Sequence, residues 1–354
     1  MKILHRYIGR TVIGGSFMVL LVLGALLAFV DFVSELDEVG KGSYSMFNAA
    51  QFVLYSLPKR LYELFPTAVL IGSLLSLGAL AANSELTVMR AAGISIMRIV
   101  FSVLRAGFIL LLFVALVGEF VVPLSERQAQ AVRAQELSQT VTLGGEGGFW
   151  ARDGQRFVYV SHVYPGLNLG RVKVYEFDEI HQLKQITQAR SAHFTNDKWQ
   201  LEQVTRTDFS GTQVVSEQVR FETWDSLLNP DLFDVVSVKP ENMSAYDLFL
   251  YSQYLNDNEL ESSHYLLAFW IKIFTPLSTL VMLLIALPFV FSSQRSAGAG
   301  NRVLFGLLLG IGFFLLNRTM NHLGQVYNVN PFISAAAPVL IVAMASFYAL
   351  RKVK

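Results

Sequence analysis

The sequence predicts an α-helical membrane protein of six transmembrane helices with one inserted all-β domain of the sandwich or jelly-roll kind. Three observations lead to this fold class: six long apolar stretches, one long polar insert between the third and fourth stretches, and an uneven distribution of basic residues. Of the 354 residues, 53% are hydrophobic and only 16% are charged, whereas soluble domains carry about 25% charged residues. The excess of apolar side chains predicts contact with lipid.

Each apolar stretch is long enough to cross a bilayer, whose hydrocarbon core is about 30 Å thick and needs roughly 20 helical residues. The stretches cover residues 11–30, 64–84, 99–123, 266–293, 303–323 and 331–350. They divide the chain into residues 1–124 with three spans, residues 125–261 with the insert, and residues 262–354 with three more. The first stretch is too long for a signal-peptide core, so we expect it to remain as a helix.

Basic residues predict the orientation, because cytoplasmic segments of membrane proteins carry an excess of Lys and Arg. In one orientation the cytoplasmic segments hold a single acid, Glu85, and these bases: Lys2, Arg6, Arg10, Arg90, Arg98, Arg295, Arg302, Arg351, Lys352 and Lys354. The opposite side then holds the insert, in which acids outnumber bases, and an acidic cluster: Asp31, Glu35, Asp37 and Glu38. Both termini are therefore expected in the cytoplasm and the insert outside it.

The insert has the pattern of short β-strands. Residues 157–163 are rich in β-forming side chains, and residues 171–177 alternate on a period of two. Similar short runs occur near 192–194, 199–204, 214–223 and 235–238. Turn signals separate them, such as Asp153-Gly154 and Pro165-Gly166. Many short strands at this spacing are typical of a sandwich or jelly roll.

A short amphipathic helix is predicted on the cytoplasmic side, within residues 83–95. Asn83 or Ser84 can cap its start, and Gly93 can end it in the left-handed conformation. Leu86 and Met89 fall on one face. Such a helix either lies on the lipid surface or docks to a cytoplasmic partner, and the residues alone leave both interpretations open.

The sequence contains none of the motifs that predict catalysis. It has no cysteine, no G-x-x-x-x-G-K-[ST], no H-E-x-x-H and no G-x-S-x-G, and its six histidines are scattered. We therefore expect no enzyme activity, no metal site, no cofactor and no nucleic-acid partner. If the protein performs work, its energy source is another polypeptide.

Charged residues within the spans are expensive in lipid and are usually paired or functional. Glu119 and Lys272 are expected at similar depth in the third and fourth spans, so we hypothesise a structural ion pair, with a substrate role as the alternative. Arg318 lies fifteen residues beyond Val303, which at helical rise is roughly 22 Å. An arginine at that depth either grips a phosphate with paired donors or extends to the interface.

Further cations are expected near the outer surface, where each is either a phosphate ligand or a plain interfacial anchor. They are Arg133, Lys59, Arg60 and, beside the acids, Lys41. The first span also contains Gly14, Gly15 and Gly24. Glycines in such helices permit close packing, but they could equally leave room for acyl chains.

Short motifs occur in a defined order along the whole chain. They are Arg6-Tyr7-Ile8-Gly9, Phe29-Val30-Asp31, Lys41-Gly42-Ser43-Tyr44, Pro58-Lys59, Phe65-Pro66, Ser84-Glu85-Leu86, Val88-Met89, Arg133-Ala134-Gln135, Trp150-Ala151, Phe157-Val158-Tyr159, Lys272-Ile273-Phe274 and Arg295-Ser296. No single motif is decisive. In this order and with this topology, the chain resembles the LptF/LptG family, the permease subunits of the lipopolysaccharide export ABC transporter, and within it the G-type subunits.

The resemblance implies a jelly-roll domain in the periplasm of a bacterium and a multi-pass protein in its inner membrane. It implies a heterodimer with the F-type permease and two copies of a cytoplasmic ATPase that binds the ATP. It also implies a bitopic LptC-like protein and a periplasmic LptA-like bridge. The segment 83–95 then resembles the coupling helix, in which Glu85 contacts the ATPase groove and Leu86 and Met89 fill it, with Arg90 and Gly93 in the same segment.

The resemblance also implies a path for lipopolysaccharide from the outer leaflet into a cavity between the two permeases. Acyl chains would contact the first and fifth spans, including Leu26, Phe29 and Phe32, and lipid A phosphates would meet the outer cations. The jelly roll would shield acyl chains through Trp150, Phe157 and Tyr159, unless these aromatic residues form ordinary domain core. Some family members carry lysines at the outer end of the first span, where this chain has acids. Either the cations named above replace them, or divalent cations bridge acid to phosphate.

Two other functional classes remain. One is an ABC permease that transmits ATP-driven motion to periplasmic partners without moving lipid, which would share the coupling helix but need no lipid cavity. The other is a membrane-tethered periplasmic enzyme or receptor, which would need a polar constellation in the insert; the sequence shows none.

Overall fold

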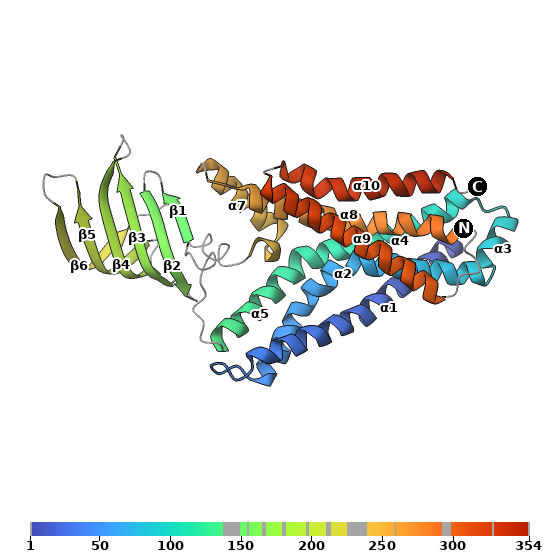
Figure 1. Ribbon diagram of the computed structural model, residues 1–354, viewed down its shortest axis with the longest axis horizontal. Coiled ribbons are helices and arrows are strands. Elements are labelled where there is room, and N and C mark those ends of the chain that lie inside the picture. Colours follow the sequence, from blue (N-terminus) through green and yellow to red (C-terminus); the bar gives the residue numbers. More distant parts are fainter. Residues whose placement is uncertain are drawn as a thin grey trace. The chain divides into compact units, whose positions relative to one another are not determined.

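A computed structural model describes residues 2–136, 149–153, 156–164, 168–178, 182–195, 198–209, 214–224, 239–258, 260–291, 299–327 and 329–352 (Figure 1). The chain forms two compact units. The helical unit comprises Met1–Val132, Ser244–Phe249 and Ser262–Lys354, and the β unit comprises Arg133–Met243 and Leu250–Glu261. The turn signals at Gly154, Pro165-Gly166 and the predicted strand at 235–238 lie outside the described residues.

Six helices of the described chain are long and apolar enough to cross a membrane, which confirms the predicted count. The helical unit contains α1 (Lys2–Glu35), α2 (Met46–Ala82), α3 (Glu85–Ala91), α4 (Ile96–Leu116), α8 (Ser263–Phe291), α9 (Ala299–Val326) and α10 (Pro331–Arg351). A π-helical turn, Val117–Val121, joins α4 to α5 (Val122–Glu136), so the third span is one continuous helix. Short 3₁₀ turns occur at Leu36–Glu38 and Pro240–Asn242, and α7 covers Ala245–Asp257.

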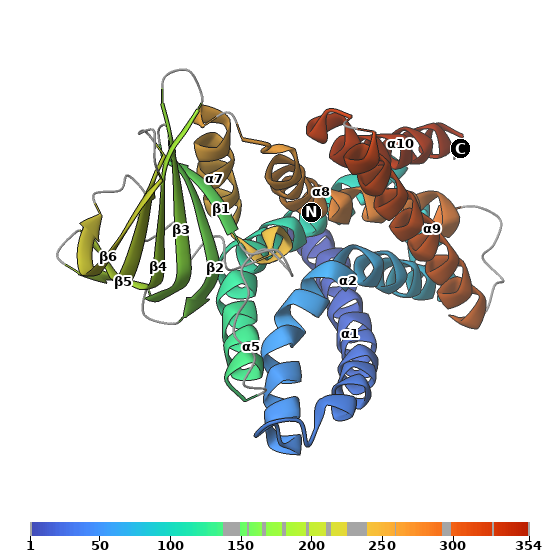
Figure 2. The same ribbon diagram turned by 60° about the vertical axis from the view of Figure 1, so that its left-hand side comes forward.

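The helix α2 lies at the centre of the helical unit. It packs against α1, α8 and α9, while α8 also packs against α10 and α4 (Figure 2). Of the 18 consecutive residues that form the apolar stretch of each span, 67% are buried in α2, compared with 22% in α1 and 17% in α9. The first and fifth spans therefore present most of their apolar side chains outward, to lipid or to a partner.

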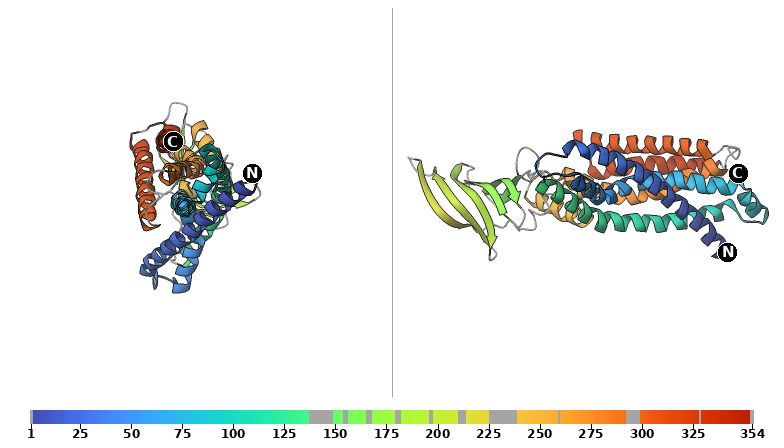
Figure 3. Two further views of the ribbon diagram at one scale, coloured as in Figure 1. Left: turned by 90° about the vertical axis from the view of Figure 1, so that its right-hand side faces the viewer. Right: turned by 90° about the horizontal axis from the view of Figure 1, so that it is seen from below.

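The two ends of the helical unit differ. One end, named here the termini end, holds the start of α1, the end of α10 and the short helix α3 (Figures 1 and 3). At the other, the insert end, α1 finishes at Glu35 and α2 begins at Met46. The chain thus crosses the unit six times and returns to the end where it began.

Glycines bring α1 and α2 close together. A Cβ atom built on Gly72 would lie 2.5 Å from the Cα of Ser16, and one built on Gly15 would lie 2.9 Å from the carbonyl oxygen of Gly72. Gly24 would collide with Leu61, whereas Gly14 has open space around it. Of the two uses that the sequence left open for these glycines, Gly15 and Gly24 serve helix packing.

Within its described residues the β unit forms a six-stranded antiparallel sheet with strands in sequential order, which confirms the predicted all-β insert (Figure 1). Its strands are β1 (Phe149–Asp153), β2 (Arg156–Tyr164), β3 (Asn168–Phe177), β4 (Leu183–Thr195), β5 (Lys198–Asp208) and β6 (Val215–Trp224). Each strand pairs with its neighbours along the chain. The core face is lined by small aliphatic residues that pair across strands, such as Val158 with Val174 and Val160 with Val172.

The buried side of the sheet shifts phase across its middle strands. On β3 the buried residues Leu169 and Val172 are three apart, and on β5 Leu201 and Val204 are three apart. A strict two-residue alternation would put the members of each pair on opposite faces. Residues with positive φ lie within both intervals, Arg171 at 46° and, between Leu201 and Val204, Gln203 at 51°. The local irregularity restores the buried face beyond it.

We expect Gly72→Val to destabilise the helical unit, because the added side chain would push α1 away from α2. Overpacking of this kind costs about 1–3 kcal/mol. Thermal unfolding in mild detergent measures the effect. Gly14→Val, on the same helix pair but in open space, is the matched control and should leave the midpoint nearly unchanged; an equal loss for both variants would contradict the close crossing.

Candidate functional site

The amphipathic segment at the termini end forms α3 as predicted, but its caps differ from the prediction at one end. Ser84 precedes the helix at a φ of 61° and makes no side-chain capping bond, so the predicted hydroxyl cap is wrong. The other end matches the prediction: Gly93 has a φ of 84°. The amide of Ile94 donates to the carbonyl of Met89 at 3.1 Å and the amide of Gly93 to that of Arg90 at 3.0 Å, which is the Schellman pattern.

The apolar face of α3 points into the protein. Leu86 is 4% exposed and belongs to the core of the helical unit, and Met89 packs against that core. Leu86 therefore fills a site in its own bundle and not a groove of a partner, whereas Met89 is only partly buried and its contact with a partner stays a prediction. The outward surface instead carries Val88, which is 65% exposed, together with Thr87 and Arg90.

Glu85 has a partner that the sequence did not predict. The hydroxyl of Tyr7 on α1 donates to Oε2 of Glu85 at 2.7 Å. Two residues earlier, Nδ1 of His5 lies 2.6 Å from Oγ of Ser102 on α4. The first turns of α1 are thus hydrogen-bonded both to α3 and to α4, the helix that follows it. The residues are 78 and 97 positions apart, a separation at which local sequence patterns carry no signal.

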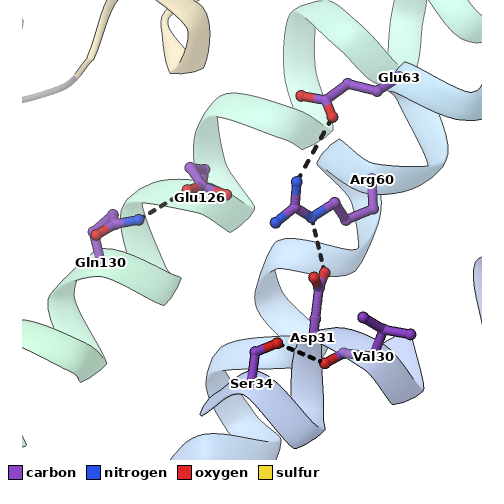
Figure 4. A network of polar contacts seen from close by, with 7 residues as sticks. All are labelled: Val30, Asp31, Ser34, Arg60, Glu63, Glu126 and Gln130. Carbon is purple, nitrogen blue, oxygen red and sulfur yellow. Dashed lines mark hydrogen bonds and ion pairs between the residues drawn. The ribbon is translucent and has the colours of Figure 1, made fainter. Parts of the chain in front are cut away.

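At the insert end, α1 and α2 are joined by charges. Nε of Arg60 lies 2.8 Å from Asp31, and Nη1 lies 3.8 Å from Glu63 (Figure 4). Lys41 pairs with Glu38 at 3.0 Å. Two cations expected to hold phosphates are therefore already neutralised by acids of the same chain.

The acids of this end have partners as well. The carboxylate of Glu35 is buried and accepts a hydrogen bond from the hydroxyl of Tyr44 at 2.9 Å. Asp31 pairs with Arg60 and Glu38 pairs with Lys41. Together with Glu35, three acids of the predicted cluster thus have partners within the chain. This leaves them less suited to hold a divalent cation against a lipid phosphate.

Arg318 differs from these cations. It is exposed on α9 and forms no ion pair with any residue that the structure describes. Neighbouring turns of α9 are also polar: the amide of Asn321 donates to Asn317 at 3.3 Å, and Gln325 lies 3.0 Å from His264 of α8. Lys59 is half-buried on α2, and Arg133 is half-buried on α5. The structure does not bring Arg318 and Arg60 into one pairing network.

The apolar residues proposed to meet acyl chains lie on the outward surface of α1. Leu26 is 58% exposed and Phe29 is 66% exposed, while Phe32 is half-buried. On α9 the exposed apolar residues are Leu304, Leu308, Ile311, Phe314 and Leu315. Both spans rest on α2 and both offer continuous apolar surface.

The three aromatic residues proposed for a lipid path share one face of the sheet. Trp150 pairs with Tyr159 across β1 and β2, and Phe157 lies two residues from Tyr159. Their face is opposite to that of Val158, which is fully buried, and Trp150 is 53% exposed. Trp150 stacks on Tyr175 with ring centroids 5.6 Å apart. These residues form an outward aromatic cluster, so the alternative that they make the domain core is wrong.

Glu119 and Lys272 lie in neighbouring regions, but the hydrogen bonds of Glu119 go elsewhere. Its two carboxylate oxygens accept from the backbone amides of Ala245 at 2.8 Å and Tyr246 at 3.2 Å. The backbone carbonyl of Lys272 accepts from the hydroxyl of Tyr62 at 3.4 Å. The ion pair with Lys272 therefore stays a prediction, while the bond between Glu119 and α7 is a finding that no local sequence pattern predicts.

Comparison with known proteins identifies the family of the chain. The model of the lipopolysaccharide export system permease LptF/LptG family matches residues 6–352. The chain belongs to the LptF/LptG family. It is 34% identical over 351 residues to the lipopolysaccharide export system permease protein LptG of Haemophilus influenzae, covering 99% of this chain and 98% of that protein.

Similarity extends to a second relative. The chain is 37% identical over 339 residues to the protein of the same name from Escherichia coli K12, covering 95% of this chain and 94% of that protein. The matched regions cover nearly the whole of this chain and of each relative, so they include the six spans and the β unit. The resemblance seen in the sequence motifs is thus confirmed, and this LptF/LptG family member is a multi-pass inner-membrane permease of the lipopolysaccharide export system rather than a member of a catalytic family.

We expect Leu86→Ala to lower the stability of the helical unit by about 2–5 kcal/mol, the usual cost of truncating a buried leucine. Thermal unfolding in detergent measures it. Val88→Ala, two residues away on the exposed side of α3, is the control and should change the midpoint little. If Val88→Ala cost as much as Leu86→Ala, the orientation of α3 would be wrong.

Proposed function

We propose that this chain is a permease subunit that takes lipopolysaccharide from the outer leaflet of the inner membrane and passes it toward a periplasmic bridge. The observation that carries the proposal is the pair of outward apolar spans, α1 and α9, with Arg318 exposed among the polar turns near the insert end of α9. Acyl chains suit the apolar surface, and a guanidinium suits phosphate because its paired donors match phosphate oxygens. Because the chain belongs to the family of lipopolysaccharide export permeases, we assign lipopolysaccharide as its lipid.

The orientation follows from charge. The termini end carries Arg6, Arg10, Arg90 and Arg98, and positively charged segments stay in the cytoplasm. This puts α3 and both termini in the cytoplasm and the insert end, with the β domain, on the periplasmic side. Arg318 then lies at the level of the outer leaflet, where lipid A phosphates are found.

The driving force comes from a separate ATPase, which binds the ATP and docks on the exposed side of α3. Val88, Thr87 and Arg90 offer the contact surface there, with the Glu85 carboxylate held by Tyr7. A heterodimer with an F-type permease supplies a second such helix, so two ATPase subunits bind. This chain needs no cofactor of its own.

Closure of the ATPase pair moves α3, and the movement reaches α1 through the Tyr7–Glu85 bond and the shared core. The outward apolar faces of α1 and α9 line a cavity with the partner permease, which narrows and expels the lipid upward. The β domain receives it and passes it to an LptA-like bridge, with a bitopic LptC-like protein in the assembly. Strands β1 and β6 form the edges of the described sheet, and edge strands can pair with further strands of another chain.

A photoreactive residue at Phe29 of α1 or Phe314 of α9 should crosslink to lipopolysaccharide in cells, as detected by immunoblotting. Ile109 is equally exposed but lies on α4, and a photoreactive residue there should give little product. Equal crosslinking from all three positions would mean that these spans contact only bulk lipid. It would then favour a permease that transmits motion without moving lipid.

Arg318→Glu should reduce the crosslink from Phe314 about tenfold, because a charge-assisted bond to phosphate is replaced by repulsion. Arg318→Lys keeps the charge and should retain part of the signal. Unchanged crosslinking in Arg318→Glu would remove Arg318 from the lipid site.

Val88→Asp should prevent the ATPase from co-purifying with the permease, because it puts a charge on the exposed surface of α3. The folded state should be unaffected, since Val88 is outside the core. Pull-down from mild detergent measures the attachment. Met97→Asp, also exposed but beyond the turn after α3, is the comparison; full retention of the ATPase by Val88→Asp would contradict the docking surface.

A further inference from the structure

The start of α7 is held by a side chain of the third span. An α-helix leaves its first amide groups without partners inside the helix. Here Glu119 accepts from the first two, those of Ala245 and Tyr246. The third, that of Asp247, donates to Oγ of Ser244 at 3.0 Å. The first turn of α7 is therefore fully bonded, and two of its three bonds come from a residue more than 120 positions earlier.

Glu119 reaches α7 from a π-helical turn, Val117–Val121. Such turns are uncommon and often mark functional positions. Gly118, beside Glu119, packs against the ring of Tyr62, where a Cβ would overlap the ring. Tyr62 in turn donates to the carbonyl of Lys272. The turn is thus held by contacts with α2 and α8, and the half-buried Glu119 bonds the start of α7.

A carboxylate side chain suits the amino end of a helix. The amino end of a helix carries partial positive charge, and a negative group there is stabilising. Bonds from backbone amides to a carboxylate are stronger than bonds between neutral groups. A second link, Arg127 of α5 to Asp247 at 3.5 Å, is exposed and therefore contributes little. Glu119 therefore supplies the shortest polar contacts that the start of α7 makes with the third span, while Phe249 also packs against Phe269 of α8 with ring centroids 5.8 Å apart.

The position of α7 gives this attachment a consequence. The boundary between the two compact units falls inside α7, after Phe249. Its first turn belongs to the helical unit, and from Leu250 onward it belongs to the β unit. A helix transmits displacement along its axis because its hydrogen bonds connect every turn. Whatever moves Glu119 therefore moves the segment through which the chain leaves the β domain.

We propose that Glu119 is a positioning residue for lipid hand-over: it makes the start of α7 follow the third span, so that rearrangement of the spans reaches the β domain. The inference rests on the proposed function, in which the β domain receives lipid from the spans. It assigns Glu119 to the transfer step and not to ATP hydrolysis or to lipid entry. It assigns the bonded oxygens of the carboxylate to the backbone of α7, and the ion pair with Lys272 stays a separate prediction.

Hydrogen exchange tests the contact directly in the intact permease complex. Glu119→Gln keeps the size of the side chain but removes its charge and one acceptor. The amides of Ala245 and Tyr246 should exchange about tenfold faster or more, with little change in α2. The control variant is Glu63→Gln, which removes a carboxylate of α2 that lies near Arg60. It should leave the amides of Ala245 and Tyr246 protected. Unchanged protection in Glu119→Gln would overturn the proposal.

A functional measurement separates hand-over from the earlier steps. With photoreactive residues at Phe29 and at Trp150, Glu119→Gln should keep the lipopolysaccharide crosslink from Phe29 and the rate of ATP hydrolysis, while the crosslink from Trp150 falls several-fold. If the wild-type protein shows no crosslink at Phe29 or Trp150, the proposed function fails. If wild type shows both and Glu119→Gln keeps both, only the inference about Glu119 fails.

A charge swap distinguishes the helix cap from the ion pair. Glu119→Lys combined with Lys272→Glu would restore an ion pair, but it would place an ammonium group at the amino end of α7. The double variant should therefore be as defective in transfer as Glu119→Lys alone. Recovery of transfer in the double variant would show that Lys272 is the true partner and would overturn the proposal.

Discussion

The helical unit depends on the burial of α2 among its neighbours. Lipid gives helices little hydrophobic reason to associate, so membrane helices are held by close packing and by small residues at their crossings. Gly72 meets Ser16 and Gly15 at backbone distance, and α9 packs on the same helix. The two spans with the most outward apolar surface thus share one support. A shift of α2 changes the position of both.

The insert end shows how the protein pairs its charges. Arg60, Lys41 and Glu35 all have partners within the chain, so several charges of α1, α2 and the segment between them are offset by their neighbours. Ion pairs this exposed contribute little to stability, but each one reduces the charge that the two side chains present to their surroundings. Arg318 on α9, by contrast, is exposed and forms no ion pair with any described residue.

Local patterns were sufficient to predict the spans, the strands and the short helix at 83–95. Apolar length alone identifies a span, and the left-handed end at Gly93 needs only one residue type. The sequence could not show what covers an apolar face: Leu86 was expected to meet a partner, but its own bundle buries it. The same limit applied to Trp150, whose face of the sheet depends on register.

Contacts between distant segments were also beyond local patterns. Tyr7 reaches Glu85 and Glu119 reaches α7 only because the bundle brings their helices together. The phase shift between Leu169 and Val172 likewise depends on the positive φ of Arg171. A residue other than glycine gives no signal in the sequence that it will adopt this conformation. Sequence periodicity therefore gave the strands but not the continuity of the buried face.

The sequential order of the strands bears on how the protein is made. Every strand of the described sheet pairs with the strand before it in the chain, so each hairpin can close as soon as its second strand is synthesised. Proteins dominated by such short-range pairings fold quickly, and domains fold as units during synthesis. The described sheet has all of its strands before any residue of α8, α9 or α10 is synthesised, so its pairing does not wait for the later spans.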